Sequence, residues 1–335
     1  MKQKGQQSIS FEKRVFLVSS GTVVGEKEGQ GPLGDLFDLV CPDPVFGEDS
    51  WEKAESTMQK EAIQTALGKA GLASYQIRYL FGGDLLGQLI ATSFGVEELN
   101  LPVFGLYGAC STCGEALGLG AMAVDGGYGD YVLAVTSSHF ASAEKQFRFP
   151  LAYGNQRPLS ATWTVTGAGA FVLGNRKSHA AITGFTPGKI VDFGVKDSMN
   201  MGACMAPAAC ETIYQNFMDF SRQPKDYDRI ITGDLGYVGK RILVDLLKEK
   251  GFDISGNHVD CGIEIFDAET QDTHSGGSGC GCSAVTLGAK ILPALEKGAW
   301  KRVLFVPTGA LLSPVSFNEG QSVPGIAHGI VIEHC

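Results

Sequence analysis

Short and continuous apolar runs recur along the chain, and they predict buried strands. The runs are rich in β-branched residues, are bounded by Gly or Asp, and show no alternation with polar positions. This pattern is typical of strands that are covered on both faces. The predicted strands are Val15–Val18, Tyr79–Phe81, Tyr131–Thr136, Ala170–Leu173, Ile230–Thr232, Val303–Val306 and Gly329–Glu333.

Segments with apolar residues at helical spacing lie between these runs. The segment Ser50–Gly68 begins with a capping Ser and carries Glu in its first turn, which is the usual start of a helix. The other predicted helices are Cys110–Val124, Met205–Phe220, Val238–Lys250 and Cys282–Leu295. Strands that alternate with helices predict an α/β fold around a layered and mostly parallel sheet.

An internal repeat indicates that the chain consists of two similar halves. Asp84 lies in IRYLFGGDLLGQ, and this block returns as DRIITGDLGYVG around Asp234. Farther along, GACSTCGEALGLGAM (Gly108–Met122) is echoed by GSGCGCSAVTLGAK (Gly277–Lys290), and each is followed by a matching strand. We therefore predict halves of residues 1–177 and 178–335, packed as one body.

Composition and charge limit the classes of function that the protein can have. The 335 residues are 44% hydrophobic, which allows a large core. The net charge of −9 argues against nucleic-acid binding, which requires excess Lys and Arg. Nine cysteines without regular spacing indicate reduced thiols. No apolar run reaches the roughly 18 residues of a membrane span, and MKQKGQQSIS is not followed by the apolar stretch of a secretory signal.

Cys110 is the strongest candidate for chemistry. It lies at the predicted start of a helix, between the small residues of Gly108–Thr112. The free N–H groups and the dipole at a helix N-terminus lower the pKa of a thiol, and a backbone N–H can form an oxyanion hole. The alternative is that Cys110 is only a small buried hydrophobe.

The other cysteine and glycine motifs favour packing over chemistry. Cys110 and Cys113 form a CxxC, and Cys280 and Cys282 form a CxC, but both lie in Gly- and Ala-rich helix starts rather than in zinc knuckles. Gly276–Gly279 precedes a helix but lacks the features of a P-loop and of a dinucleotide fingerprint. We therefore expect no metal and no nucleotide cofactor.

Polar residues at strand ends and in one loop are candidates for ligand binding. His139 follows a predicted strand, where ligand crevices open in α/β folds, although a surface histidine is an equal alternative. Arg148 lies between two Phe residues in a loop and suits recognition of a carboxylate, unless the loop is simply solvated. Asp84 and Asp234 follow paired strands, where a helix-capping role is the simpler interpretation.

The repeated halves and the Cys in Gly-Ala-Cys-Ser resemble the thiolase superfamily, and in particular β-ketoacyl-acyl carrier protein synthase III. The resemblance implies a layered αβαβα fold and a Cys nucleophile that works with a His and an Asn from the second half. Here the matching positions read Thr232-Gly233-Asp234, without His, and Gly277–Cys280, without Asn. Ordinary condensing chemistry would lack its proton acceptor and its oxyanion donor. Cys110 is therefore expected to be a vestigial nucleophile in a non-enzyme.

Longer stretches resemble the stage V sporulation protein AD family. They are EGQGPLGDLFD, GGDLLGQ, YGACST, TSSHFASAEKQFRFPLAYG, MGACMAPAA and GALLSP. The resemblance implies a spore-associated protein that binds dipicolinic acid, free or with calcium, and that supports its uptake with membrane proteins of the same operon. It also implies a peripheral place on the cytoplasmic face of the spore or forespore membrane, without a spanning segment.

For such a ligand, we expect a pocket around the vestigial nucleophile. Its expected residues are Asp84, Cys110, His139, Arg148, Asp234 and Ser278. The first alternative is an active acyl transferase or condensing enzyme that uses Cys110, with His139 or His274 as the base. The second is a scaffold for membrane partners with incidental ligand binding. Homodimer formation is a further expectation, because thiolase relatives commonly pair.

Overall fold

A computed structural model describes residues 2–147 and 156–335, and within them twelve strands form one sheet. The strand order is β11-β10-β13-β16-β9-β2-β8-β6-β4-β5, with β1 and β3 paired to β2. The strands are β1 (Gln3–Lys4), β2 (Ser8–Gly25), β3 (Leu39–Cys41), β4 (Tyr79–Gly83), β5 (Val103–Gly105), β6 (Tyr131–Ser138), β8 (Gly167–Gly174), β9 (Ala180–Thr186), β10 (Arg229–Thr232), β11 (His258–Asp260), β13 (Arg302–Val306) and β16 (Gly329–His334). Two small sheets pair β7 (Trp163–Thr164) with β12 (Gly277–Ser278), and β14 (Thr308–Ala310) with β15 (Gly325–Ala327).

The sheet has parallel outer parts and an antiparallel centre. At one end β4 runs parallel to β5 and β6, and at the other β10 runs parallel to β11 and β13. Between them, β8, β2, β9 and β16 pair antiparallel. The prediction of a mostly parallel sheet is therefore wrong at the centre. A continuous apolar run indicates that both faces of a strand are buried. It does not indicate the direction of the strand, because parallel and antiparallel strands can be buried to the same extent.

The predicted helices are present, with small shifts at their ends. The helices are α1 (Glu26–Gly29), α2 (Trp51–Ala70), α3 (Ile90–Val96), α4 (Thr112–Asp125), α5 (Phe140–Phe147), α6 (Met201–Phe220), α7 (Gly236–Glu249), α8 (Cys261–Ile265), α9 (Cys280–Thr286), α10 (Leu292–Glu296) and α11 (Pro314–Asn318). A π-helical turn, Leu287–Ile291, joins α9 to α10. Ser50 caps α2 as expected, because its side chain accepts a hydrogen bond from the Lys53 N–H at 3.3 Å.

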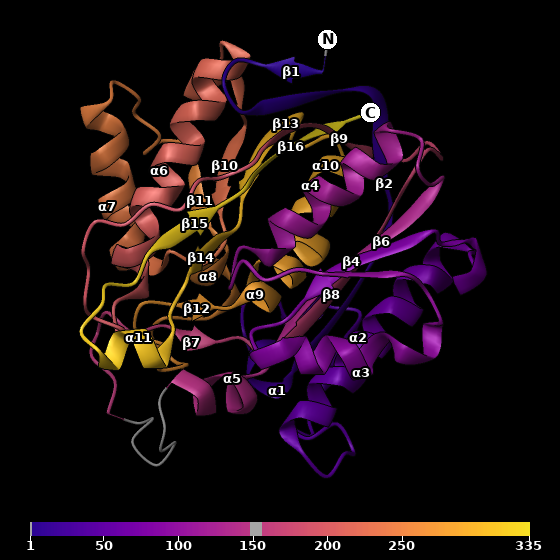
Figure 1. Cartoon of the computed structure of the whole chain (residues 1–335), viewed down its shortest axis with the longest axis horizontal. Helices are drawn as coiled ribbons and strands as arrows, with labels where there is room; N and C mark the ends of the chain where they lie inside the picture. The colour runs from indigo at the N-terminus through magenta and orange to yellow at the C-terminus, as the bar shows by residue number, and fades with distance from the viewer. Residues whose placement is uncertain (1, 148–155) are drawn as a thin grey trace.

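Helices and strands form the layers that Figure 1 shows, and three apolar clusters lie between them. The central cluster joins α4 and α9 to strands of both halves, and it contains Leu117, Phe171, Val285 and Phe305. Helix α2 packs on the outer face of the first half, while α6 and α7 pack on the outer face of the second. The order helix, half of the sheet, helix, other half of the sheet, helix confirms the predicted αβαβα architecture, with the two halves hydrogen-bonded into one sheet.

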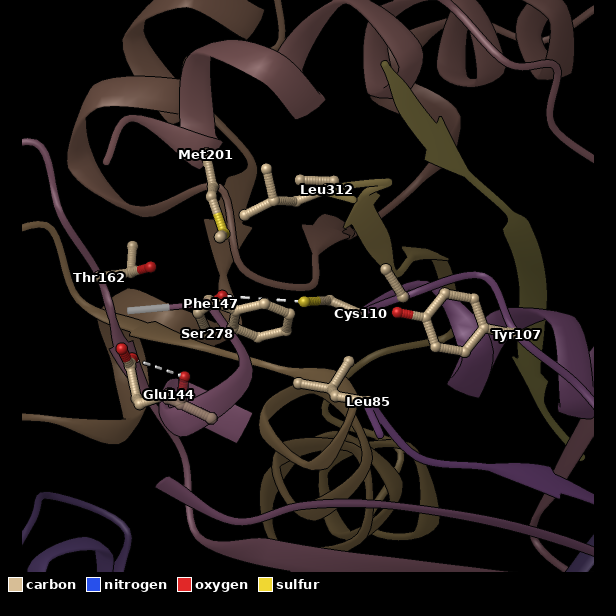
Figure 2. A pocket seen from close by; sticks show the side chains of 12 residues that line it. Leu85, Tyr107, Cys110, Glu144, Phe147, Thr162, Met201, Ser278 and Leu312 are labelled. Atoms are coloured by element: carbon tan, nitrogen blue, oxygen red, sulfur yellow. Dashed lines mark hydrogen bonds between the residues drawn. The ribbon is translucent and has the colours of Figure 1, made fainter. Parts of the chain in front are cut away.

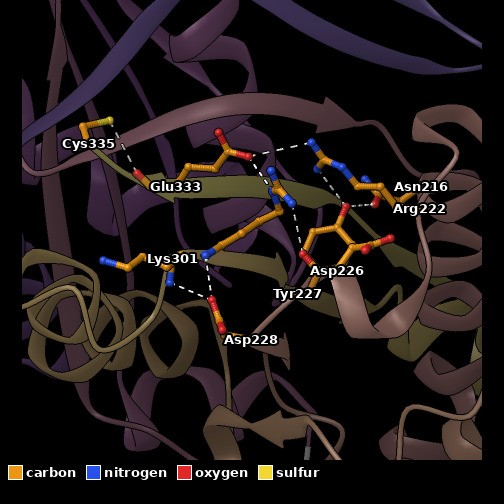
Figure 3. Close-up of polar contacts among 9 residues, drawn as sticks. Asn216, Arg222, Asp226, Tyr227, Asp228, Lys301, Glu333 and Cys335 are labelled. Atoms are coloured by element: carbon orange, nitrogen blue, oxygen red, sulfur yellow. Dashed lines mark hydrogen bonds and ion pairs between the residues drawn. The ribbon is translucent and has the colours of Figure 1, made fainter.

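In the second half of the chain, polar contacts connect the segment that follows α6 to neighbouring elements (Figure 3). The Tyr227 hydroxyl donates to Asn216 Oδ1 at 2.6 Å and accepts from Arg222 Nη1 at 3.1 Å. Arg302 Nε donates to Glu333 Oε1 at 2.5 Å, and Arg222 Nη2 lies 3.7 Å from the same oxygen. These bonds connect helix α6 to strands β13 and β16.

The two central helices begin side by side, and this brings the repeated blocks together. Helices α4 and α9 contact each other, and the residues just before them include Cys110 and Ser278. Gly279 precedes α9 with φ +108°, and an added Cβ would lie 2.5 Å from Ser138 Oγ. Only glycine fits this close approach at a positive φ. The internal repeat thus places one site at the junction of the two halves.

Candidate functional site

Cys110 lies in a tight turn two residues before α4. Ala109 has φ +50°, an uncommon value for a residue with a side chain. The turn is held by two hydroxyls, since Ser111 Oγ donates to the Gly108 carbonyl at 2.7 Å and Thr112 Oγ1 donates to the Ala109 carbonyl at 2.7 Å. The small and hydroxylated neighbours of Cys110 therefore serve the backbone geometry that positions the thiol.

A chain of polar contacts runs from Cys110 into the second half of the protein. Cys110 Sγ lies 3.8 Å from Ser278 Oγ, and a dashed line in Figure 2 joins the two. The Ser278 hydroxyl in turn donates to Asp234 Oδ2 at 2.8 Å. Asp234 also accepts from the Gly279 N–H at 3.0 Å and from Thr308 Oγ1 at 2.7 Å. Asp234 therefore anchors two segments, at Ser278–Gly279 and at Thr308, and holds Ser278 against the thiol.

The surroundings of Cys110 keep its thiol protonated. Burial is the largest cause that raises its pKa well above the ordinary value, and the Asp234 carboxylate raises it further. The hydrogen bonds from Ser278 and Gly279 offset this only in part. The prediction that the helix N-terminus lowers this pKa is therefore wrong, because loss of water and a nearby carboxylate outweigh the helix dipole.

A small enclosed cavity, which we call the Cys110 cavity, adjoins the sulfur (Figure 2). Its volume is about 20 Å³, which is room for about one water molecule. Its lining is mostly apolar and comprises Leu85, Tyr107, Ala109, Cys110, Glu144, Phe147, Thr162, Thr164, Met201, Ser278, Ala310 and Leu312.

Glu144 was not singled out by the sequence analysis, yet it lies in this lining. Its Oε1 accepts from Thr164 Oγ1 at 2.9 Å, and the residue is buried. The chain before Arg148, where a loop is predicted, forms helix α5, which turns Ala143, Glu144 and Phe147 toward one side. Their helical spacing was the available signal, and the charged residues around them obscured it.

The remaining predicted residues do not all meet here. Asp84 is buried and accepts from the N–H groups of Leu86 and Thr92 at 2.8 and 2.7 Å, so it orders the segment that carries Leu85 rather than lining the cavity. His139 lies outside the Cys110 cavity, with Nε2 2.8 Å from the Pro44 carbonyl. Arg148 falls outside the described residues. Cys110, Asp234 and Ser278 are the predicted residues that the structure brings together.

The described ranges contain no group of three or more His, Cys, Asp or Glu residues arranged to hold a metal ion. Over the same ranges, no helix combines the length and the apolar character needed to cross a membrane.

The fold is that of thiolase-like condensing enzymes. OleA from Xanthomonas campestris with bound cerulenin superposes with a TM-score of 0.61 at 14% identity, covering 96% of this chain and 97% of that one. The 3-oxoacyl-[acyl-carrier-protein] synthase III from Aquifex aeolicus VF5 gives a TM-score of 0.56 at 12% identity, with 96% and 100% covered. At such low identity the likeness shows the fold alone.

The sequence itself defines the family more narrowly. Residues 5–333 match the family model of Stage V sporulation protein AD (SpoVAD). The chain is 44% identical over 333 residues to Stage V sporulation protein AD of Bacillus subtilis (strain 168), which covers 99% of this chain and 98% of the relative. The chain belongs to the stage V sporulation protein AD family.

Proposed function

We propose that this sporulation-family protein is not an enzyme and that it binds dipicolinic acid, free or with calcium, in the Cys110 cavity to support uptake of that acid into the developing spore. The observation that carries the proposal is the pair of partners at Cys110. These partners are Ser278 and Asp234. A condensing enzyme of this fold would need a base and an oxyanion donor in these places.

The contacts around Cys110 argue against the alternative of an active acyl transferase. A thiol becomes a nucleophilic thiolate when a base accepts its proton. At Cys110 the Asp234 charge instead favours the neutral thiol. The two histidines considered as bases are bonded elsewhere: His139 Nε2 lies 2.8 Å from the Pro44 carbonyl, and His274 Nδ1 lies 2.9 Å from the Pro158 carbonyl.

The cavity offers both apolar walls and hydrogen-bonding groups to a planar acid. Leu85 and Phe147 would contact the ring, and Tyr107 would donate to a carboxylate. Ser278 would donate to it as well once its hydroxyl turns away from Asp234. A cavity of about 20 Å³ is too small for such a ring, so the side chains of Phe147 and Met201 must rotate away on binding.

Charge decides the form of the ligand. Glu144 and Asp234 are buried near the cavity, and a bare dianion would be repelled by any of these carboxyls that is ionised. Calcium is a hard cation that takes oxygen ligands, so a calcium chelate would reduce this repulsion and could accept Glu144 as a further ligand. Arg148 remains our candidate cation for a free carboxylate.

Isothermal titration calorimetry with dipicolinate, with and without calcium, tests the proposal. We expect saturable binding that Ser278→Ala and Arg148→Ala each weaken by about tenfold, the effect of one charge-assisted hydrogen bond. The matched control is Arg176→Ala, because Arg176 is exposed. Absence of saturable heat, or unchanged affinity in both site variants, would sink the ligand assignment. Turnover of an acyl thioester through Cys110 would show that the protein is an enzyme.

The β5 edge carries our proposal of a homodimer. Val103 and Phe104 of this outermost strand are 43% and 49% exposed, whereas β11 at the opposite edge is buried or half-buried. An uncharged and exposed strand edge pairs readily with a second copy. Sedimentation should show a dimer that Phe104→Glu converts to a monomer, and a monomeric unmodified protein would contradict this arrangement.

Peripheral association with membrane proteins of the same operon, on the cytoplasmic face of the spore or forespore membrane, is the last part of the proposal. Cofractionation of the protein with those partners, and its release when they are deleted, tests it. Unchanged fractionation in the deletion strain would contradict it.

A further inference from the structure

A second and larger cavity, which we call the Trp51–Trp163 cavity, lies apart from the Cys110 cavity. Its volume is about 280 Å³. It is lined by Gly25, Glu26, Lys27, Glu28, Pro42, Pro44, Trp51, His139, Phe140, Ala141, Trp163 and Thr166. Among the residues that the structure describes, none lines both cavities.

Strand β7 and helix α5 form the wall between the two cavities. On β7, Thr164 lines the Cys110 cavity, while its neighbour Trp163 lines the second cavity, as expected from the alternation of side chains along a strand. On α5, Phe147 lines the first cavity and Phe140 lines the second. The second cavity is thus a separate space behind the proposed dipicolinate site.

Two aromatic pairs stand in the Trp51–Trp163 cavity. Phe140 and Trp163 are stacked with ring centroids 4.0 Å apart and an interplanar angle of 13°. Trp51 and His139 lie with centroids 5.6 Å apart at 37°. Aromatic walls of this kind, contributed by distant parts of the chain, favour a flat ring as the occupant.

Two cations lie against the indole ring of Trp163. Lys27 Nζ is 4.5 Å from the ring centroid, and Arg157 Cζ is 4.9 Å from it. Arg157 Nη2 donates to the backbone carbonyl and the carboxylate of Asp272. Two cations beside one aromatic ring produce local positive charge, which would stabilise an anion nearby.

Arg157 also has unused donors. Its side chain is only 3% exposed, and Nε and Nη1 are buried without a hydrogen-bond partner among the residues that the structure describes. A buried guanidinium N–H that lacks an acceptor is costly, so an acceptor outside the described protein atoms would satisfy it.

Nearby carboxyl groups limit the charge of an occupant. Glu26 and Glu28 line the same cavity, and Glu28 is buried with Oε1 accepting from the Thr166 N–H at 3.0 Å. Asp272 already neutralises part of the Arg157 charge. A ligand with one negative group is therefore favoured over a dianion.

We propose that the Trp51–Trp163 cavity is a second ligand site that takes a planar aromatic ring bearing a single carboxylate. The ring lies between the two aromatic pairs, and the carboxylate faces Lys27, which lines the cavity. Arg157 contacts the Trp163 ring without lining the cavity, and it adds positive charge near this wall. The size fits, because a protein cavity of about 150 Å³ is enough to bind benzene. This site stands independently of dipicolinate binding at Cys110.

Tryptophan fluorescence with benzoate as the probe tests the second site. The chain has three tryptophans, and Trp300 stacks against Arg229 rather than in the cavity. In a Trp300→Phe background, emission therefore comes from Trp51 and Trp163 alone. We expect a saturable change with benzoate, and a weaker affinity for dipicolinate at this site.

Two substitutions locate the binding. Lys27→Met keeps the length of the side chain without its charge, and Phe140→Leu keeps an apolar group without the flat face. Each should weaken benzoate binding by about tenfold. The matched control is Lys189→Met, since Lys189 is exposed and lies in a different part of the fold. Thermal unfolding of each variant checks that it is folded.

The outcomes separate this site from the dipicolinate site. Ser278→Ala is expected to weaken dipicolinate in calorimetry while leaving the benzoate titration unchanged. The second site is overturned if benzoate gives no saturable change, if both Lys27→Met and Phe140→Leu bind as the parent does, or if Ser278→Ala abolishes the benzoate response.

Discussion

Removal of the Asp234 carboxylate is the sharpest test of how the site is built. The side chain is 1% exposed and accepts hydrogen bonds from Ser278, Gly279 and Thr308. Asp234→Ala would leave the buried Gly279 N–H without an acceptor and would free both hydroxyls. Asp234→Asn would keep one acceptor oxygen but would turn an NH₂ group toward these donors.

The expected loss follows from these bonds. Hydrogen bonds to a charged group contribute about 1.5–3 kcal/mol each, and two of the three donors are hydroxyls that can rotate to other acceptors. Removing the buried charge also recovers part of its desolvation cost. We therefore expect Asp234→Ala to lower the free energy of unfolding by about 2–4 kcal/mol, and Asp234→Asn to lower it by a smaller amount.

Equilibrium unfolding in guanidinium chloride measures this change, provided that the denaturant slope stays constant. Ser278→Ala supplies the matched control, because it removes one of the three donors. In a double-mutant cycle, Asp234 and Ser278 should show a coupling energy of about 1 kcal/mol. A loss below about 1 kcal/mol for Asp234→Ala, together with additive effects in the cycle, would refute the view that this carboxylate anchors the site.

Three further predictions concern single groups. Burial raises the pKa of Glu28 to about 7, so the folded state holds a proton between pH 4.5 and 7 that the unfolded state has lost, and stability should fall across that window as pH rises. Glu28→Gln should remove roughly 3 kcal/mol of this decline in pH-dependent unfolding, and parallel curves for the two proteins would contradict it. Cys110 should react with iodoacetamide more slowly than the partly exposed Cys41, and Asp234→Asn should speed the reaction by lowering the Cys110 pKa. Mass spectrometry measures the order of modification, and a result in which Cys110 is modified first would contradict this prediction. Ser50→Ala should lower thermal stability by about 1 kcal/mol through loss of the α2 cap, and an unchanged melting temperature would count against that cap.

Much of the fold could be predicted because local patterns carry it. The apolar runs mark strands, and the Ser50 cap marks the start of α2. The repeated blocks of the sequence predicted that two helix starts are equivalent, and these starts do adjoin at Cys110 and Ser278. The direction of the central strands could not be predicted from the sequence, because parallel and antiparallel pairing bury the same residues.

The candidate site was predicted in part. Cys110 could be named because it keeps the position of the nucleophile in the resembled family. Asp234 and Ser278 could be named because they lie in the segments where that family has its His and its Asn. Glu144 was missed, and His139 lies outside the Cys110 cavity, because the position along α5 decides which cavity a side chain lines. His139 and Phe140, at the start of the helix, line the Trp51–Trp163 cavity, whereas Glu144 and Phe147 line the Cys110 cavity.

By itself the sequence determined the layered α/β architecture, the internal repeat and the unusual helix start at Cys110, since these depend on local spacing and on residues close in the chain. Only the tertiary structure decided the state of the thiol and the existence of two cavities. The pKa of Cys110 depends on burial and on a carboxylate more than a hundred positions away in the sequence. The two cavities form because β7 and α5 pack between them, and each cavity is lined by different residues of these elements. Cys110 thus lies where a nucleophile would be expected, in surroundings that hold its proton in place.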